Sequence, residues 1–574
     1  MIRPTERLQE LQATARLAST ACRPEELGTA RQTRHSFSRA LARFLADNGG
    51  KVTRRVWDLD PEGRGRAVYR VEVGSHVIEA VVFSQVIDEE TRTDRVIAED
   101  WDATIALVDG EASPDVVERL AGHVTRQEEG RADDSSLIWG RANRSARFFD
   151  YMVEQLANGR QPEADAVSDA AYIMRSTAFY GNGKWGLRDF DGIDPDHPLS
   201  MPYRAQMLCA WLFREFSADL VEHVAAARGS AAVSLDPAWR RYLGLGNATG
   251  LGMVPYVIRH PQVMDAWVAM RELPLAWAMQ QTWGPRSVEW KRVRALLSRA
   301  GEYFEAKKSF STDPYPSGPE LAAEMEVATG WVDEYAEKSQ MNGAEVDRPC
   351  ERLHELCEQV SLELRQIVDS VLVEVDASLD ADITTLMRCV DRTHLQPQMT
   401  VGELRALIDE HYAWVSEFDF SRNAESSKFW FYSENNQEPR RGDRASDPGV
   451  ITEHPVGIAR DVAALRESLG DVDPQNTVAE FLISHNTHWG IVERVQSVAA
   501  LPYAEARVNP LSEDFLPLDL QRFQLALYGM ENYNPQSTDW LRVTLFGGAP
   551  TVADIHAGAQ VDDWLFLPRP QEIS

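Results

Sequence analysis

The stretch at residues 202–229 reads PYRAQMLCAWLFREFSADLVEHVAAARG. Its large apolar side chains recur at the spacing of one helical face and form a continuous stripe. The stripe consists of Met207, Leu208, Trp211, Leu212 and Phe216. Proline favours the first turn of a helix and glycine favours its end, so both boundaries carry a signal. The stretch therefore predicts a long helix in the core.

Extended segments dominate the first 135 residues of the chain. Three runs rich in β-branched and aromatic residues are separated by turns, and Gly74-Ser75 indicates a hairpin. The runs cover residues 52–59, 68–73 and 77–83, with a fourth candidate at 105–108. A helix is predicted over residues 34–46, and the sequence DNGG ends it. Residues 1–135 are expected to form a small α+β domain with an antiparallel β-meander.

Helical periodicity dominates the middle of the chain, residues 136–395. Apolar residues spaced three and four apart predict helices over 263–270, 288–304, 319–335 and 350–372. Residues 396–574 are mixed, because Thr400 and Glu403 form a capping box at the start of a helix while residues 540–546 suit a strand. The expected fold class is α+β, with a mixed α/β C-terminal region completing the site.

Composition limits the classes of function. With 44% hydrophobic residues and 16 tryptophans among 574 residues, the chain is suited to a folded interior. A net charge of −30 opposes binding to nucleic acids, which requires clustered Lys and Arg. Neither a signal peptide nor a run of about 18 apolar residues is evident. Five cysteines without a CxxC pair suit a reducing compartment. We expect a cytoplasmic protein that binds neither nucleic acid nor membrane.

The first candidate site segment is YGNGKWG at residues 180–186, with Arg188 beyond it. Glycines let the backbone approach a ligand, while Lys184 and Arg188 are suited to hold a carboxylate or phosphate. ATP binding of the P-loop type is not expected, because a tryptophan follows Lys184 where that loop has Ser or Thr. We predict that Tyr180, Asn182, Lys184 and Arg188 contact an anionic substrate. The alternative is a turn packed by aromatic residues.

The second segment is GLGNATGLG at residues 244–252. Its first three glycines are spaced GxGxxxG, whereas the dinucleotide-binding fingerprint is GxGxxG. That fingerprint also follows a buried apolar strand, and the residues before this segment do not suit one, so NAD or flavin binding is not expected. Asn247 and Thr249 are candidate substrate contacts. The alternative is close packing of the backbone, with these two residues as turn caps.

The third segment, HNTHWG at residues 485–490, places two histidines three residues apart. On a helix His485 and His488 would face the same way, and Glu493 follows them. They are candidates for general acid–base catalysis, or for a divalent metal site that needs a further ligand. Structural, hydrogen-bonded histidines are the alternative.

Two further polar and aromatic segments complete the candidate set. Each combines side chains that can complement a polar molecule, although edge-strand and turn chemistry explains them equally well. The candidate substrate contacts are Arg422, Tyr432 and Glu434 in the fourth segment and Tyr528, Glu531 and Asn532 in the fifth.

These segments lead to two hypotheses from different classes. The preferred one is an enzyme, a lyase or hydrolase acting on a small anionic substrate, in which His485, His488, Tyr180 and Lys184 supply the chemistry. It requires the five segments to share one pocket. The alternative is a binding or scaffold protein that forms homo-oligomers through Trp- and Tyr-rich surfaces.

Overall fold

The computed structural model describes most of the chain. The described residues are 6–15, 31–87, 101–123, 135–146, 148–167, 171–185, 192–247, 261–306, 316–338, 340–341, 344–388, 395–417, 430–433, 439–441, 450–452, 456–499, 501, 503, 517–531, 543–559, 561, 564–567 and 569–570. Helices and strands together confirm the α+β class expected from the sequence. None of the helices in these residues has the length and hydropathy of a membrane span.

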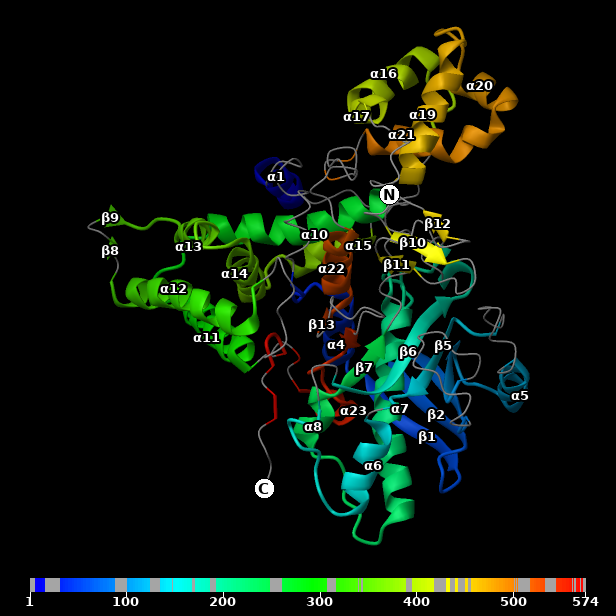
Figure 1. Cartoon of the computed structure of the whole chain (residues 1–574), viewed down its shortest axis with the longest axis vertical. Coiled ribbons are helices and arrows are strands. Elements are labelled where there is room, and N and C mark those ends of the chain that lie inside the picture. The colour runs from blue at the N-terminus through cyan, green and yellow to red at the C-terminus, as the bar shows by residue number, and fades with distance from the viewer. Residues whose placement is uncertain are drawn as a thin grey trace.

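A mixed sheet of nine strands organises the body of the protein (Figure 1). Its strands are β1 (Lys51–Leu59), β2 (Gly65–Val73), β3 (His76–Ser84), β4 (Ala103–Asp109), β5 (Ile138–Arg144), β6 (Tyr172–Gly181), β7 (Gly244–Asn247), β13 (Met530–Glu531) and β14 (Val543–Leu545). They are ordered β1-β2-β3-β4-β5-β6-β7-β14-β13, and the pair β6–β7 is parallel while the other pairs are antiparallel. The first four strands confirm the predicted meander. The sheet continues past the border expected near residue 135, because β5 pairs with β4.

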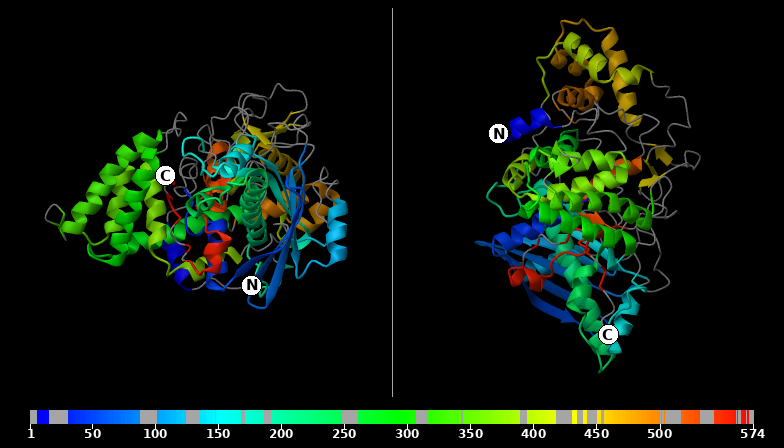
Figure 2. Two further views of the ribbon diagram at one scale, coloured as in Figure 1. Left: turned by 90° about the horizontal axis from the view of Figure 1, so that it is seen from below. Right: turned by 90° about the vertical axis from the view of Figure 1, so that its left-hand side faces the viewer.

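The long helix α7 (Arg204–Arg228) lies against one face of the sheet (Figures 1 and 2) and confirms the helix predicted over residues 202–229. Its predicted stripe is buried in the main core with side chains from the central strands. The buried Arg214 donates to the carbonyl oxygens of Leu243 at 2.8 Å and Pro550 at 3.0 Å. These bonds hold the C-terminal part of the chain to the helix that the sheet packs on.

A shorter helix, α5 (Pro114–His123), covers part of the opposite face. Val117 and Leu120 of α5 form a small separate core with residues that include Val81 and Ala106 of the sheet. Apolar packing on both faces explains why β4 is buried along almost its whole length.

A second core lies beside the sheet and consists of helices. They are α11 (Val288–Ala306), α12 (Gly318–Glu337), α13 (Pro349–Glu358) and α14 (Leu362–Val375), with part of α10 (Pro261–Gln280). The single helix predicted over residues 350–372 is two helices. Ser361 accepts a hydrogen bond from the Leu364 N–H and so caps a new helix at α14. Arg39 of α4 (Phe37–Asp47) joins the two cores through a buried ion pair with Glu374.

Further helices project as a separate group at one end of the molecule (Figures 1 and 2). We call α16 (Val401–His411), α17 (Ala413–Glu417), α19 (Val456–Gly470), α20 (Val478–Ser484), η4 (Asn486–His488) and α21 (Trp489–Val498) the α16–α21 unit. The capping box predicted at Thr400 and Glu403 begins α16.

The remaining described elements are short or lie around these parts. They are α1 (Glu6–Thr14), α6 (Phe149–Ala157), η2 (Gly183–Trp185), α8 (Pro237–Tyr242), β8 (Gln340–Met341), β9 (Ala344–Glu345), α15 (Asp380–Arg388), β10 (Trp430–Ser433), β11 (Pro439–Arg441), β12 (Val450–Thr452), α22 (Pro517–Tyr528) and α23 (Val552–His556). Strand β10 pairs with both β11 and β12 in a small second sheet.

Candidate functional site

Polar and aromatic side chains gather on the sheet face that α5 partly covers. Thr104 pairs with Arg141, and Trp139 pairs with Tyr180. Directly opposed residues on neighbouring strands share a face, as do residues two apart on one strand. Trp101, which precedes β4, contacts Arg141. We call Trp101, Thr104, Trp139, Arg141 and Tyr180 the sheet-face cluster.

The guanidinium of Arg141 lies at the centre of this cluster. Its Cζ is 4.4 Å from the ring centroid of Trp101 and 5.6 Å from that of Tyr180. One of its nitrogens, Nη2, donates to the Tyr180 hydroxyl at 3.4 Å. Because a cation is attracted to the faces of aromatic rings, these contacts fix the position of the positive charge. Arg141 is buried and Tyr180 is half-buried, so the phenol side of the cluster is nearer to solvent.

Three side-chain donors of the cluster are buried, and the part of the chain that the structure describes gives them no partner. Trp101, Thr104 and Trp139 are 4%, 1% and 3% exposed. Among the described residues, no hydrogen-bond partner exists for the indole nitrogens of Trp101 and Trp139 or for the Thr104 hydroxyl. Buried polar groups are normally paired, and an unpaired one costs about 1–3 kcal/mol. An indole N–H can only donate, so the cluster is suited to a ligand whose atoms accept.

The glycine-rich segment at residues 180–186 contributes Tyr180 to this cluster and turns away after it. Asn182 is tied to the neighbouring loop, since its N–H donates to the Leu137 carbonyl at 2.9 Å and its Nδ2 to the Ser136 carbonyl at 3.4 Å. Lys184 is exposed in η2, with its Nζ 5.8 Å from the Trp185 ring. Arg188 lies outside the described residues. The segment thus supplies one cluster residue and a structural asparagine.

Asn247 lies in the same sheet but belongs to its packing. It is buried in β7, and its Nδ2 donates to the Ser176 Oγ of β6 at 2.9 Å. Ser176 pairs with Ala142, the strand neighbour of Arg141, so strand alternation places it on the opposite face. A Cβ on Gly246 would come within 2.7 Å of the buried Tyr172 ring. This geometry matches the alternative of close backbone packing. Thr249 lies outside the described residues.

The two histidines of the third segment lie in the α16–α21 unit, apart from the sheet that carries Tyr180 (Figures 1 and 2). The ring of His485 stacks on Phe481 with centroids 4.5 Å apart, and its centroid is 6.5 Å from that of His488. The Nε2 of His488 is 3.0 Å from the Ser468 Oγ. Burial, with the neighbouring His485 adding to it, lowers the pKa of His488 below its ordinary value.

These histidines are not joined by further ligands in the described part of the chain, where no group of three or more His, Cys, Asp or Glu is arranged to hold a metal ion. Glu493, the proposed carboxylate ligand, is half-buried in α21, and its backbone carbonyl accepts from the Ser497 hydroxyl at 2.7 Å. The pair therefore has a visible structural role at the turn between α20 and α21.

Tyr528 is placed in the core, at the end of α22. Its ring is 4.8 Å from Tyr203, 5.4 Å from Phe37 and 6.0 Å from Trp267, centroid to centroid, and the residue is 5% exposed. These contacts make it a packing residue between α4, α10 and the residue that precedes α7. The other candidates of the last two segments give no side-chain geometry. Arg422, Glu434 and Asn532 lie outside the described residues, and only the backbone is described for Tyr432 in β10 and Glu531 in β13.

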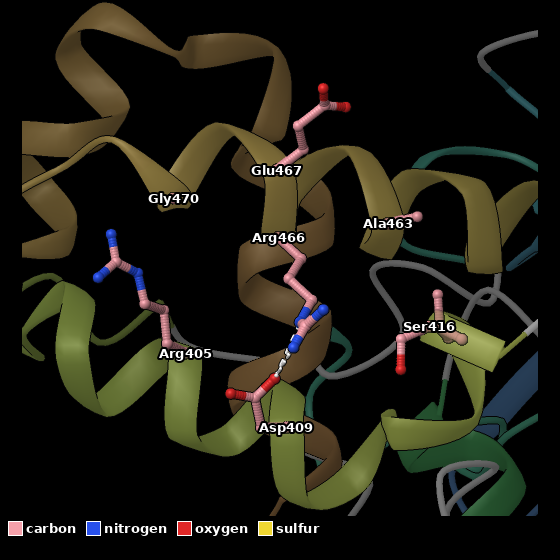
Figure 3. A pocket seen from close by; sticks show the side chains of 8 residues that line it. Arg405, Asp409, Ser416, Ala463, Arg466, Glu467 and Gly470 are labelled. Atoms are coloured by element: carbon pink, nitrogen blue, oxygen red, sulfur yellow. Dashed lines mark hydrogen bonds and ion pairs between the residues drawn. The ribbon is translucent and has the colours of Figure 1, made fainter.

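A surface groove of about 470 Å³ lies between α16 and α19 in the α16–α21 unit (Figure 3). Arg466 crosses it, with Nη2 2.8 Å from the Asp409 Oδ1. Arg405 donates to the carbonyl oxygens of Leu469 and Val472. Because Arg405 and Arg466 already bind protein acceptors, the groove supports an anion site less strongly than the buried donors of the sheet-face cluster do.

Four of the five cluster residues were not predicted from the sequence. The signal was present in residues 138–143, IWGRAN, where the larger polar or aromatic side chains of Trp139, Arg141 and Asn143 occupy alternate positions. Such alternation indicates that one face of a strand carries them together. Trp101 and Thr104 carry no comparable local signal, since only the pairing of β4 with β5 brings them there.

Comparison of the chain with protein-family models, with curated proteins and with solved structures found no match. The functional argument therefore depends on the geometry of the cluster.

Proposed function

We propose that the protein binds a small anionic molecule, a carboxylate or a phosphate, at the sheet-face cluster. The observation that carries this proposal is that the buried donors of Trp101, Thr104 and Trp139 have no partner among the described residues, on the sheet face where Trp101 contacts Arg141 and Thr104 pairs with it. An acceptor-only ligand would pair these donors and recover the free energy that their burial costs.

The charge of the rest of the chain makes a local cation important. With a net charge of −30, the protein as a whole repels anions, so an anionic ligand must be held by short-range contacts. Arg141 is held by two aromatic rings in a buried position, where a charge-assisted hydrogen bond is stronger than in water.

The lyase or hydrolase activity expected from the sequence belongs, in this proposal, at the same site. Tyr180 is the cluster residue that can transfer a proton, because its hydroxyl lies against the Arg141 guanidinium and its ring is half-buried. His485 and His488 lie in the α16–α21 unit and are given no part in this chemistry.

A thermal-shift screen tests the proposal. Acetate, citrate, inorganic phosphate and glycerol phosphate would be titrated into the full chain, since a ligand of the folded state raises its melting temperature. Arg141→Met should abolish the shift while Arg66→Met, at an exposed arginine of β2, should preserve it. Equal shifts in both variants, or no shift with any of the four anions, would overturn the proposal.

A further inference from the structure

Two large apolar side chains are exposed at the turn between α20 and α21. Ile483 is 84% exposed and Trp489 is 52% exposed. Tryptophan is enriched among the residues that dominate protein interfaces, and half its surface here lies open to solvent. We call Ile483, Trp489 and the rings of His485 and His488 between them the α20–α21 corner.

The corner is held in shape by stacked rings. Phe481 is buried beneath it, and its centroid lies 4.5 Å from that of His485 and 6.0 Å from that of His488. The bond between the His488 Nε2 and the Ser468 Oγ joins the corner to α19. A surface that is ordered before binding pays less conformational entropy when a partner arrives.

The unit that carries the corner is acidic. Residues 395–417 and 456–499 contain ten Asp and Glu, four Arg and no Lys. Arg405 donates to backbone carbonyls and Arg494 is buried, while Arg466 is half exposed and pairs with Asp409. With ten acidic residues against four arginines, carboxylates outnumber cations in this unit.

Two carboxylates flank the apolar pair. Glu480 lies three residues before Ile483 on α20, and Glu493 lies four residues after Trp489 on α21. Residues three or four apart share one side of a helix, so each glutamate shares a helix side with its apolar neighbour, and the Glu480 carboxylate accepts from the Thr477 N–H at 2.7 Å and hydroxyl at 3.0 Å. The corner thus combines apolar contact area with negative charge.

We propose that the α20–α21 corner docks a basic peptide segment of a partner protein, one that carries Lys or Arg together with an apolar side chain. The apolar side chain packs on Trp489 and Ile483, and the cations face Glu480 and Glu493. Charge complementarity selects this partner over an acidic or uncharged apolar one. The sheet-face cluster takes no part, so this docking does not depend on the proposed anion binding.

Fluorescence anisotropy with three labelled ten-residue peptides tests the proposal. The peptides alternate Lys with Leu, Glu with Leu, and Lys with Ser, and each is titrated with the full chain. The Lys–Leu peptide should bind, and Trp489→Ala and Ile483→Ser should each weaken it about tenfold or more. Val288→Ser is the matched control, because Val288 is 77% exposed on α11 of the second core, and it should leave binding unchanged.

The charge requirement has its own variant. Glu480→Gln keeps the capping box that Thr477 forms at the start of α20, so the helix stays intact. Combined with Glu493→Gln, it should weaken the Lys–Leu peptide severalfold at low salt and have less effect at high salt. Binding of the Glu–Leu peptide with equal affinity, or Lys–Leu binding that survives both corner variants, would overturn the proposal. Concentration-dependent dimerisation that Trp489→Ala abolishes would also overturn it, in favour of a second copy.

Discussion

Thr104→Val should stabilise the ligand-free protein. The hydroxyl is 1% exposed and has no hydrogen-bond partner among the described residues, so the folded state loses its hydration without compensation. That loss is worth about 1–3 kcal/mol. Valine has nearly the same shape and an equally high preference for strands, so the substitution adds no cavity and no strain. The free energy of unfolding should rise by about 1 kcal/mol or more.

The same substitution should weaken anion binding, since it removes one of the donors. Urea unfolding followed by tryptophan fluorescence measures the stability, with the midpoint rising at constant m value. Thr104→Ser is the control, because it keeps the hydroxyl and should keep the binding while losing the methyl contacts. A valine variant that is less stable than the native protein would refute the reasoning, because it would mean that the hydroxyl has a partner in the native state.

Three further predictions concern buried residues outside the sheet-face cluster. Arg39→Met leaves Glu374 buried without this ion-pair partner and should lower the free energy of unfolding in urea by about 3–5 kcal/mol. Adding Glu374→Gln to the same chain should restore most of that loss, and a loss under about 1 kcal/mol for Arg39→Met would contradict the buried pair. Burial raises the pKa of Asp265 from 3.8 to about 6, so the stability contributed by its protonated carboxyl is present below about pH 4 and is lost as the pH rises through 6. The free energy of unfolding of Asp265→Asn should match that of the native protein at about pH 4 and exceed it by up to about 3 kcal/mol at about pH 7. A difference that stays constant with pH would argue against the shift. Gly246→Ala forces a Cβ within 2.7 Å of a buried tyrosine ring and should lower the free energy of unfolding by about 1–3 kcal/mol. Gly301→Ala is the control, because a Cβ there would have no packing neighbour within 4 Å among the described residues. Equal melting temperatures for the two variants would count against the close packing of β6 and β7.

The sequence predicted those helices and strands that are determined by residues close together in the chain. The apolar stripe of α7 and its terminal proline and glycine lie within 28 residues, and the capping box of α16 lies within four. The meander β1–β4 follows from runs and turns that are adjacent in the chain. The joining of β7 to β14 pairs Leu245 with Leu545, three hundred residues away, and no local pattern announces it.

The candidate site residues show the same difference between local sequence signals and long-range strand pairing. Tyr180 was predicted from the glycines beside it, but its partner Arg141 lies on another strand and enters only through the register of β5 with β6. The histidine pair was recognised from its spacing, yet its position in the α16–α21 unit depends on helix packing that the spacing does not encode. Residues close in sequence were thus easier to recognise than residues brought together by strand pairing.

Anomalous X-ray scattering from crystals soaked in selenate tests the central claim most directly, because selenate is an acceptor-only oxyanion whose position the selenium signal reports. The account predicts a peak whose oxygen shell lies within roughly 3.5 Å of the indole nitrogens of Trp101 and Trp139 and of the Arg141 guanidinium. Selenate peaks elsewhere on the protein, with none at the sheet-face cluster, would contradict it.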